Sequence, residues 1–80
     1  MGARRYRFHC TDGRDAVFDL SGRLVQRERD LRGFAEQAAR ALMRGGDAHD
    51  AWVGWAVDVY DPLGRRRMTL PFADVPREGR

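Results

Sequence analysis

The sequence predicts an α+β fold, a two-layer sandwich in which one amphipathic helix covers one face of a four-stranded antiparallel sheet. Two observations predict it. Short segments with alternating polar and apolar residues occur in two pairs, and turn residues separate the members of each pair, as in β-hairpins. Between the two pairs, apolar residues recur at spacings of three and four, which is typical of a helix. The expected order is therefore ββαββ, with the second sheet face exposed.

The first hairpin is expected over residues 5–20. Residues 5–10 alternate strictly, with Tyr6, Phe8 and Cys10 on one side. Asp12-Gly13 supplies turn chemistry, and residues 16–20 alternate again as the return strand. Ser21-Gly22 ends the hairpin, and residues 23–29, which show no clean period, are expected to form a connector.

A helix of about four turns is expected next, and Asp30 is a plausible N-cap because its carboxylate can accept a hydrogen bond from a free backbone N–H. Gly45-Gly46 is the stop signal. One apolar stripe along this helix consists of Leu31, Phe34, Ala35, Ala38, Ala41 and Leu42.

The second hairpin is expected from two further alternating segments. Residues 52–60 alternate, and the turn Asp61-Pro62-Leu63-Gly64 joins them to residues 65–71. Pro71 has no N–H to donate to a sheet ladder, which suits the end of a strand or an outer edge.

Eighty residues provide one core and therefore one domain, residues 1–80, with an ordered core of about 4–73 and a loose tail at 74–80. A content of 42% hydrophobic and 34% charged residues excludes a disordered chain and a membrane-spanning one. A single cysteine cannot form an internal disulfide, and the amino terminus has no secretory signal pattern. The expected location is the cytoplasm, with no membrane contact.

All basic residues are arginine: the chain has fifteen, against twelve acidic residues, for a net charge of +3. Lysine, isoleucine and asparagine are absent, as a GC-rich coding bias would produce. The abundance of arginine is thus partly a matter of composition and is a weak sign of nucleic-acid binding.

A candidate binding surface follows from the alternation. The core side of the sheet is expected to take Tyr6, Phe8, Trp55, Val57, Val59, Met68 and Leu70. The open side would then collect Arg5, Arg7, His9, Trp52, Tyr60, Arg65 and Arg67. Arginines beside exposed rings are enriched at protein interfaces, and they also suit single-stranded nucleic acid, which stacks on rings.

Two partner classes therefore stay open. The first is a non-enzymatic interaction module that forms a homo-oligomer or binds a protein partner through the open sheet face or an edge strand. The alternative is a module that binds single-stranded RNA or DNA through the open face. A plain solvated face is the third reading.

Metal binding and catalysis are not expected. His9, Cys10 and His49 provide at most three soft ligands without zinc spacing, and alternation sends His9 and Cys10 to opposite faces. The cluster Asp12, Asp15 and Asp19 is explained by turn chemistry. Because no phosphate-loop, nucleophile-elbow or dinucleotide motif occurs, we expect no cofactor, no small-molecule substrate and no enzyme activity. Cys10 is expected to be a small buried residue.

Several short motifs, taken in order, resemble a family of small uncharacterised bacterial proteins. These motifs are Tyr6-Arg7-Phe8-His9, Asp12-Gly13, Asp19 with Gly22, an Ala-rich helix, Trp55-Ala56-Val57-Asp58-Val59 with Gly64, and Leu70-Pro71-Phe72. The resemblance spans roughly residues 5–75 and departs at Arg66 and Arg67, where the family's last strand usually has apolar residues. It implies a stand-alone domain of unknown function with no catalytic residues to carry over. His9 belongs to the family motif, which favours a specific role for it, but a hydrogen-bonded structural histidine remains the first reading.

Overall fold

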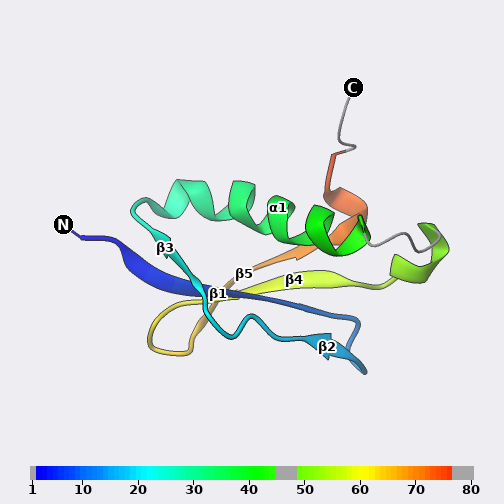
Figure 1. Ribbon diagram of the computed structural model, residues 1–80, viewed down its shortest axis with the longest axis horizontal. Coiled ribbons are helices and arrows are strands. Elements are labelled where there is room, and N and C mark those ends of the chain that lie inside the picture. The colour runs from blue at the N-terminus through cyan, green and yellow to red at the C-terminus, as the bar shows by residue number, and fades with distance from the viewer. Residues whose placement is uncertain (1, 45–48, 77–80) are drawn as a thin grey trace.

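The computed structural model describes residues 2–44 and 49–76, in which one helix lies across one face of an antiparallel sheet (Figure 1). The strands and the helix are β1 (Arg4–Thr11), β2 (Ala16–Val17), β3 (Arg23–Val25), α1 (Leu31–Met43), β4 (Ala56–Tyr60) and β5 (Arg66–Pro71). Three short 3₁₀ helices are η1 (Glu28–Asp30), η2 (His49–Trp52) and η3 (Phe72–Asp74). The α+β class is confirmed. No helix in the described part of the chain is long and apolar enough to cross a bilayer.

The sheet has the order β2-β1-β4-β5, and all its pairings are antiparallel. A further strand, β3, also pairs with β1, so that β2 and β3 lie at opposite ends of that strand. Cys10 is opposite Val17 in β2, and Arg4 is opposite Val25 in β3. The expected four strands in the order ββαββ are thus replaced, within the described residues, by five strands in the order βββαββ.

The expected second strand, residues 16–20, ends early because a side chain takes over its pairing. The carboxylate of Asp19 accepts the backbone N–H of Phe8 through Oδ2 at 3.0 Å and that of Gly22 through Oδ1 at 2.9 Å. Residues 18–22 therefore leave the ladder, and Gly22, at φ +73°, turns the chain back toward β1. The connector expected at 23–29 begins as strand β3, where Val25 is buried.

The core lies between α1 and the sheet, as the alternation of β1 and β4 predicts. Trp55 and Met68, which were expected on this side, are partly buried against it. Cys10 is buried, as expected. The buried apolar residues are Tyr6, Phe8, Cys10, Val25, Leu31, Ala35, Ala39, Val57, Val59, Leu70 and Phe72.

Helix α1 begins after Asp30, as predicted, but the Asp30 side chain makes no capping hydrogen bond. Helix η1 leads directly into α1, so Asp30 has helical dihedrals of −87° and −8° instead of the extended ones that aim a capping carboxylate at the first turn. The helix ends at Met43, where the backbone N–H of Arg44 donates to the Arg40 carbonyl at 2.9 Å. The predicted stop signal, Gly45-Gly46, lies outside the described residues.

Strand β4 begins at Ala56, not at residue 52, because Trp52 belongs to η2 and a turn follows it. The backbone N–H of Trp55 donates to the Trp52 carbonyl at 3.1 Å. The Trp52 ring packs on the rings of Trp55 and Phe72, with centroid distances of 5.3 and 5.8 Å. Trp52 therefore lies against the core. In a strand it would have been on the open face.

The second hairpin turns as predicted, but β4 and β5 are out of simple register. Asp61 accepts the Gly64 N–H at 2.9 Å, and Gly64 has the positive φ of +81° expected there. Val59 pairs with Met68 whereas Tyr60 pairs with Arg66, so Arg67 is the extra residue of a β-bulge. Pro71 ends β5, the last strand in the sheet order, as its missing N–H predicts.

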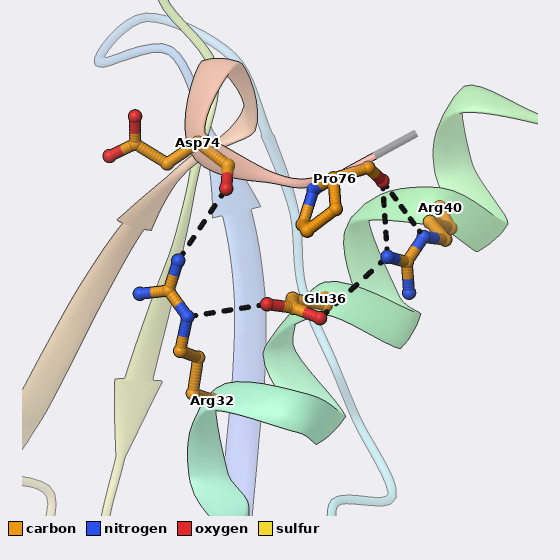
Figure 2. A network of polar contacts seen from close by, with 5 residues as sticks. All are labelled: Arg32, Glu36, Arg40, Asp74 and Pro76. Carbon is orange, nitrogen blue, oxygen red and sulfur yellow. Dashed lines mark hydrogen bonds and ion pairs between the residues drawn. The ribbon is translucent and has the colours of Figure 1, made fainter. Parts of the chain in front are cut away.

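The segment after β5 packs on the outer side of α1 (Figure 2). The guanidinium of Arg32 donates to the Asp74 carbonyl at 3.5 Å, and that of Arg40 donates to the Pro76 carbonyl at 3.1 Å. Glu36 lies between the two arginines, 3.2 Å from Arg32 and 3.7 Å from Arg40. Residues 74–76 of the expected loose tail are thus in contact with the helix, and 77–80 lie outside the described residues.

Candidate functional site

The uncovered face of the sheet contains a groove with a volume of about 700 Å³. Alternate residues of β1 form its floor, since successive side chains of a strand point to opposite faces. β4 adds two side chains, and the loops beside β2 and after β4 supply the walls. The lining residues are Arg5, Arg7, His9, Thr11, Ala16, Phe18, Asp58, Tyr60, Asp61, Pro62 and Gly64.

Four of the seven residues expected on the open face line this groove: Arg5, Arg7, His9 and Tyr60. The other three do not. Trp52 packs against the core at the far end of β4, as described above. Arg65 lies in the loop after β4, where its Nε is 3.2 Å from Asp61 Oδ2.

Arg67 is displaced by the β-bulge. Its guanidinium forms ion pairs with Glu28 of η1 and, at 3.6 Å, with Asp61. It also lines a small depression beside α1 with Leu31, Arg32 and Met68. Arg66 takes its place on the open face, opposite Tyr60.

The sequence reasoning missed Phe18 and Asp58 as groove residues. Phe18 was expected within the return strand at residues 16–20, but residues 18–22 have left the ladder, so alternation does not fix its side; it is 64% exposed. Asp58 alternates with Val57 and Val59, and this alternation was the signal that could have identified it; in the structure it lies directly opposite His9.

His9 lies between two aromatic rings. The Phe18 ring meets it edge to face at 5.3 Å, and the Tyr60 ring lies 5.6 Å away on a neighbouring strand. Nδ1 of His9 accepts the backbone N–H of Asp19 at 2.9 Å. In the neutral ring this bond requires the proton on Nε2. His9 therefore holds residues 18–22 in place, which is a structural role.

Arg5 and Arg7 also support this segment. Arg5 donates to the Ser21 carbonyl at 2.9 Å, and Arg7 donates to the carbonyls of Asp19 and Leu20 at 3.1 and 2.5 Å. Part of the donor capacity of both guanidinium groups is therefore used within the chain. The positive charge remains, but fewer N–H groups are available for a phosphate.

The groove also contains negative charge. Asp58 is half-buried beside His9, and one of its oxygens accepts the hydroxyl of Thr69 at 2.9 Å. Since Asp58 lies on the strand next to Arg5 and Arg7, both signs of charge occur on one face.

Asp61 shapes one wall of the groove. Its Oδ1 accepts the backbone N–H groups of Leu63 and Arg65, each at 2.9 Å. The pKa of Asp61 is lowered below 3.8. The backbone N–H of Arg65 contributes most to this shift, followed by the Arg65 side chain and the backbone N–H of Leu63. The buried carboxylate is thus ionised at neutral pH and fixes the loop.

Cys10 lies on the opposite face of β1, so it does not face His9. Burial, followed by the nearby charges of Asp19 and Asp58, raises its pKa from 9.0 to about 11. The thiol is therefore neutral and unreactive at physiological pH. Among the described residues, no three His, Cys, Asp or Glu side chains lie close enough together to hold a metal ion.

Two of the motifs quoted for the family resemblance, Tyr6-Arg7-Phe8-His9 and Asp19 with Gly22, form one connected network. Phe8 and Gly22 donate to the Asp19 carboxylate, and His9 accepts from the Asp19 backbone. A Cβ on Gly22 would come within 2.9 Å of the Tyr6 carbonyl, so a larger residue would not fit there without a shift. These residues therefore specify how residues 18–22 cross the edge of the sheet.

Comparison with known proteins gives one match. A search of curated proteins and a search of solved structures each find none. The family model described as "Domain of unknown function (DUF6894)" covers residues 5–73, nearly the whole described chain. The chain therefore belongs to this family.

Proposed function

We propose that this protein is a non-enzymatic interaction module that self-associates through the open sheet face. The observation that carries the proposal is the mixed charge of the groove, which is lined by Arg5 and Arg7 from β1 and by Asp58 from β4. In a two-fold symmetric dimer the same patch meets itself, so a stable interface needs a patch that is complementary to itself. A patch that carries both signs of charge meets this requirement, because its positive part can face the negative part of the second copy.

The rings of the groove supply the apolar part of such an interface. Phe18 is largely exposed and Tyr60 half-buried, and both contact the His9 ring. Aromatic residues and arginine are enriched at interfaces. Covering them would also stabilise a domain of this size, whose own core is small.

Docking on the face is favoured over addition of a strand at an edge. At one edge, Pro71 has no N–H and the bulge at Arg67 interrupts the ladder. At the other, between β2 and β3, the Asp19 carboxylate already takes the N–H of Phe8. Natural sheets use such devices against edge-to-edge association.

Light scattering and sedimentation from low micromolar to near-millimolar concentration test the proposal. We expect a monomer–dimer equilibrium that Phe18→Asp abolishes. Val53→Asp is the matched control because Val53 is also exposed, at 74%, and does not line the groove. A monomer at every concentration, or equal effects of the two substitutions, would contradict self-association.

The alternative function is binding of single-stranded nucleic acid, which the position of Arg5 and Arg7 beside Phe18 and Tyr60 favours. Asp58 opposes it. Since Trp52 is not on this face, tryptophan quenching is a poor reporter, and the anisotropy of a labelled oligonucleotide is the appropriate measurement. Binding at low salt that weakens steeply as salt rises would support this alternative.

A bacterial origin and a cytoplasmic location are part of the proposal. The Tyr-x-Phe-His resemblance supports the first. The buried, unpaired Cys10 supports a reducing compartment. Cell fractionation with an antibody against the chain tests the location.

A further inference from the structure

We infer that a second groove, between α1 and residues 17–23, binds an acidic amphipathic helix of another protein. This groove has a volume of about 780 Å³ and lies on the helix side of the sheet; it shares Phe18 with the groove proposed for self-association, and its other lining residues are different. Its lining residues are Phe8, Cys10, Val17, Phe18, Asp19, Gly22, Arg23, Phe34, Gln37, Ala38, Arg40, Ala41, Leu42 and Arg44.

The groove exists because the apolar stripe of α1 is wider than the sheet beneath it. Leu31, Ala35 and Ala39 are buried against the sheet. The next flank of the helix, which includes Phe34 and Ala38, is only partly buried, and Ala41 is exposed. The sheet does not extend under this flank, because β2 has only two residues and residues 18–22 leave the ladder.

The opposite wall of the groove is also apolar. Val17 is 48% exposed and Phe18 is 64% exposed, and both lie across the groove from α1. The α1 wall runs from Phe34 to Arg44, about 15 Å at 1.5 Å per residue. Three turns of a partner helix have this length, so the groove suits a helix with aliphatic side chains at spacings of three and four.

The charges around the groove select the sign of the partner. Arg23 lies on the strand side, with its guanidinium 3.9 Å from the Phe34 ring centroid, and Arg40 and Arg44 lie on the helix side. Among the described residues, Asp19 is the single acidic one that lines the groove, and its two oxygens already accept backbone N–H groups. Glu36 does not line the groove, but it pairs with Arg40 at 3.7 Å, so the charge of Arg40 is partly compensated within the chain. An apolar floor with a cationic rim complements an apolar helix with flanking carboxylates.

The test uses a fluorescein-labelled peptide with leucine at helical spacings of three and four, glutamate at the flanking positions and alanine elsewhere. A second peptide has lysine in place of every glutamate. By fluorescence anisotropy with the full chain, we expect the acidic peptide to bind with a dissociation constant on the order of 100 µM. The lysine peptide should bind at least about tenfold more weakly.

Two variants locate the binding. Ala41→Glu places a carboxylate at an exposed position in the groove and should weaken binding of the acidic peptide about tenfold or more. Ala73→Glu makes the same change at an exposed position in η3, outside the groove, and should leave binding unchanged. Arg23→Gln removes the charge together with the contact to Phe34 and the hydrogen bond to Gln37, and it gives a second measure that should weaken binding and reduce its salt dependence.

Three results would overturn the inference: no binding of the acidic peptide, equal binding of the lysine peptide, or equal effects of Ala41→Glu and Ala73→Glu. Sedimentation of the same variants separates this inference from self-association, because Ala41 lines only the second groove. If Ala41→Glu instead abolishes a dimer, the groove is occupied by a second copy and not by an acidic helix.

Discussion

The side chain of His9 is hydrogen-bonded to the main chain of Asp19: Nδ1 of His9 accepts the Asp19 N–H at 2.9 Å. The Asp19 side chain then turns back and accepts the N–H of Phe8, the neighbour of His9, at 3.0 Å. In each of the two bonds, the side chain of one residue accepts a backbone N–H from the segment that contains the other residue. This pair replaces the strand pairing at residues 18–20, the second part of the strand that the sequence predicts over residues 16–20.

Asp19→Ala should therefore destabilise the fold by about 2 kcal/mol or more, since two part-buried backbone N–H groups, those of Phe8 and Gly22, would lose their acceptor. Urea unfolding followed by circular dichroism measures the change. Asp15→Ala is the control: within the described residues Asp15 bonds to its neighbours through its backbone N–H and carbonyl, which alanine keeps, so the expected loss is below about 0.5 kcal/mol. Equal losses for the two variants would contradict the role given to the Asp19 carboxylate.

Gly22→Ala should cost more than Gly13→Ala. Both glycines have positive φ, +73° and +93°, so each alanine variant carries a backbone strain of about 1 kcal/mol. A Cβ on Gly22 would also lie 2.8 Å from Arg5 Cγ and 2.9 Å from the Tyr6 carbonyl, whereas one on Gly13 meets nothing within 4 Å. We expect a loss of about 2 to 4 kcal/mol for Gly22→Ala in thermal or urea unfolding. Similar losses at both positions would mean that the close approach to β1 is unimportant.

Cys10 should react slowly with iodoacetamide in the native protein. A pKa of about 11 in place of 9.0 lowers the thiolate fraction at pH 8 roughly a hundredfold, and burial adds a barrier to access. The rate in denaturant, followed by mass spectrometry, is the reference. A native rate within about tenfold of that reference would show that the thiol is more accessible than its position under α1 implies.

Acid should destabilise the fold partly through Asp61. Its folded-state pKa lies below 3.8, mainly because of the Arg65 N–H and then the Arg65 side chain, so its contribution is complete above that value and is lost as the pH falls through the folded pKa. Asp61→Asn should therefore flatten the fall in stability measured by urea unfolding from about pH 6 to about pH 2.

Asp12 is expected to act over the same pH range, because backbone N–H groups of Asp15 and Arg14 also lower its pKa. The double variant with Asp12→Asn should show a flatter profile than either single variant. A profile that is unchanged in Asp61→Asn would show that the loop after β4 does not depend on this carboxylate.

The sequence correctly predicted the elements whose side chains follow a regular strand, helix or turn pattern. Alternation placed Tyr6, Phe8 and Cys10 correctly in the core, and the helical spacing placed Leu31 and Ala35 there. The turn at Asp61 also formed as its residue types predict. In these segments each side chain's environment follows from the period of its own backbone.

The errors occur where a long-range contact replaces a local rule. Asp19 substitutes a side chain for a strand, which sends Phe18 to the groove and creates β3. Trp52 packs with Phe72, twenty residues away in the chain, and belongs to η2, so the strand expected from residue 52 begins only at Ala56. The prediction of the exposed face was correct for Arg5, Arg7, His9 and Tyr60 because they lie on regular strands. It was wrong for Arg67 because residue spacing does not reveal the β-bulge.

The bulge falls within three consecutive arginines, 65–67, so moving it by one residue changes no residue type at any position of the strand. If the irregularity slipped by one residue, another guanidinium would face Tyr60 and another would reach Glu28, so both layers of the molecule would still receive the same functional group. A run of identical side chains thus tolerates slippage that a mixed sequence would convert into a misplaced charge.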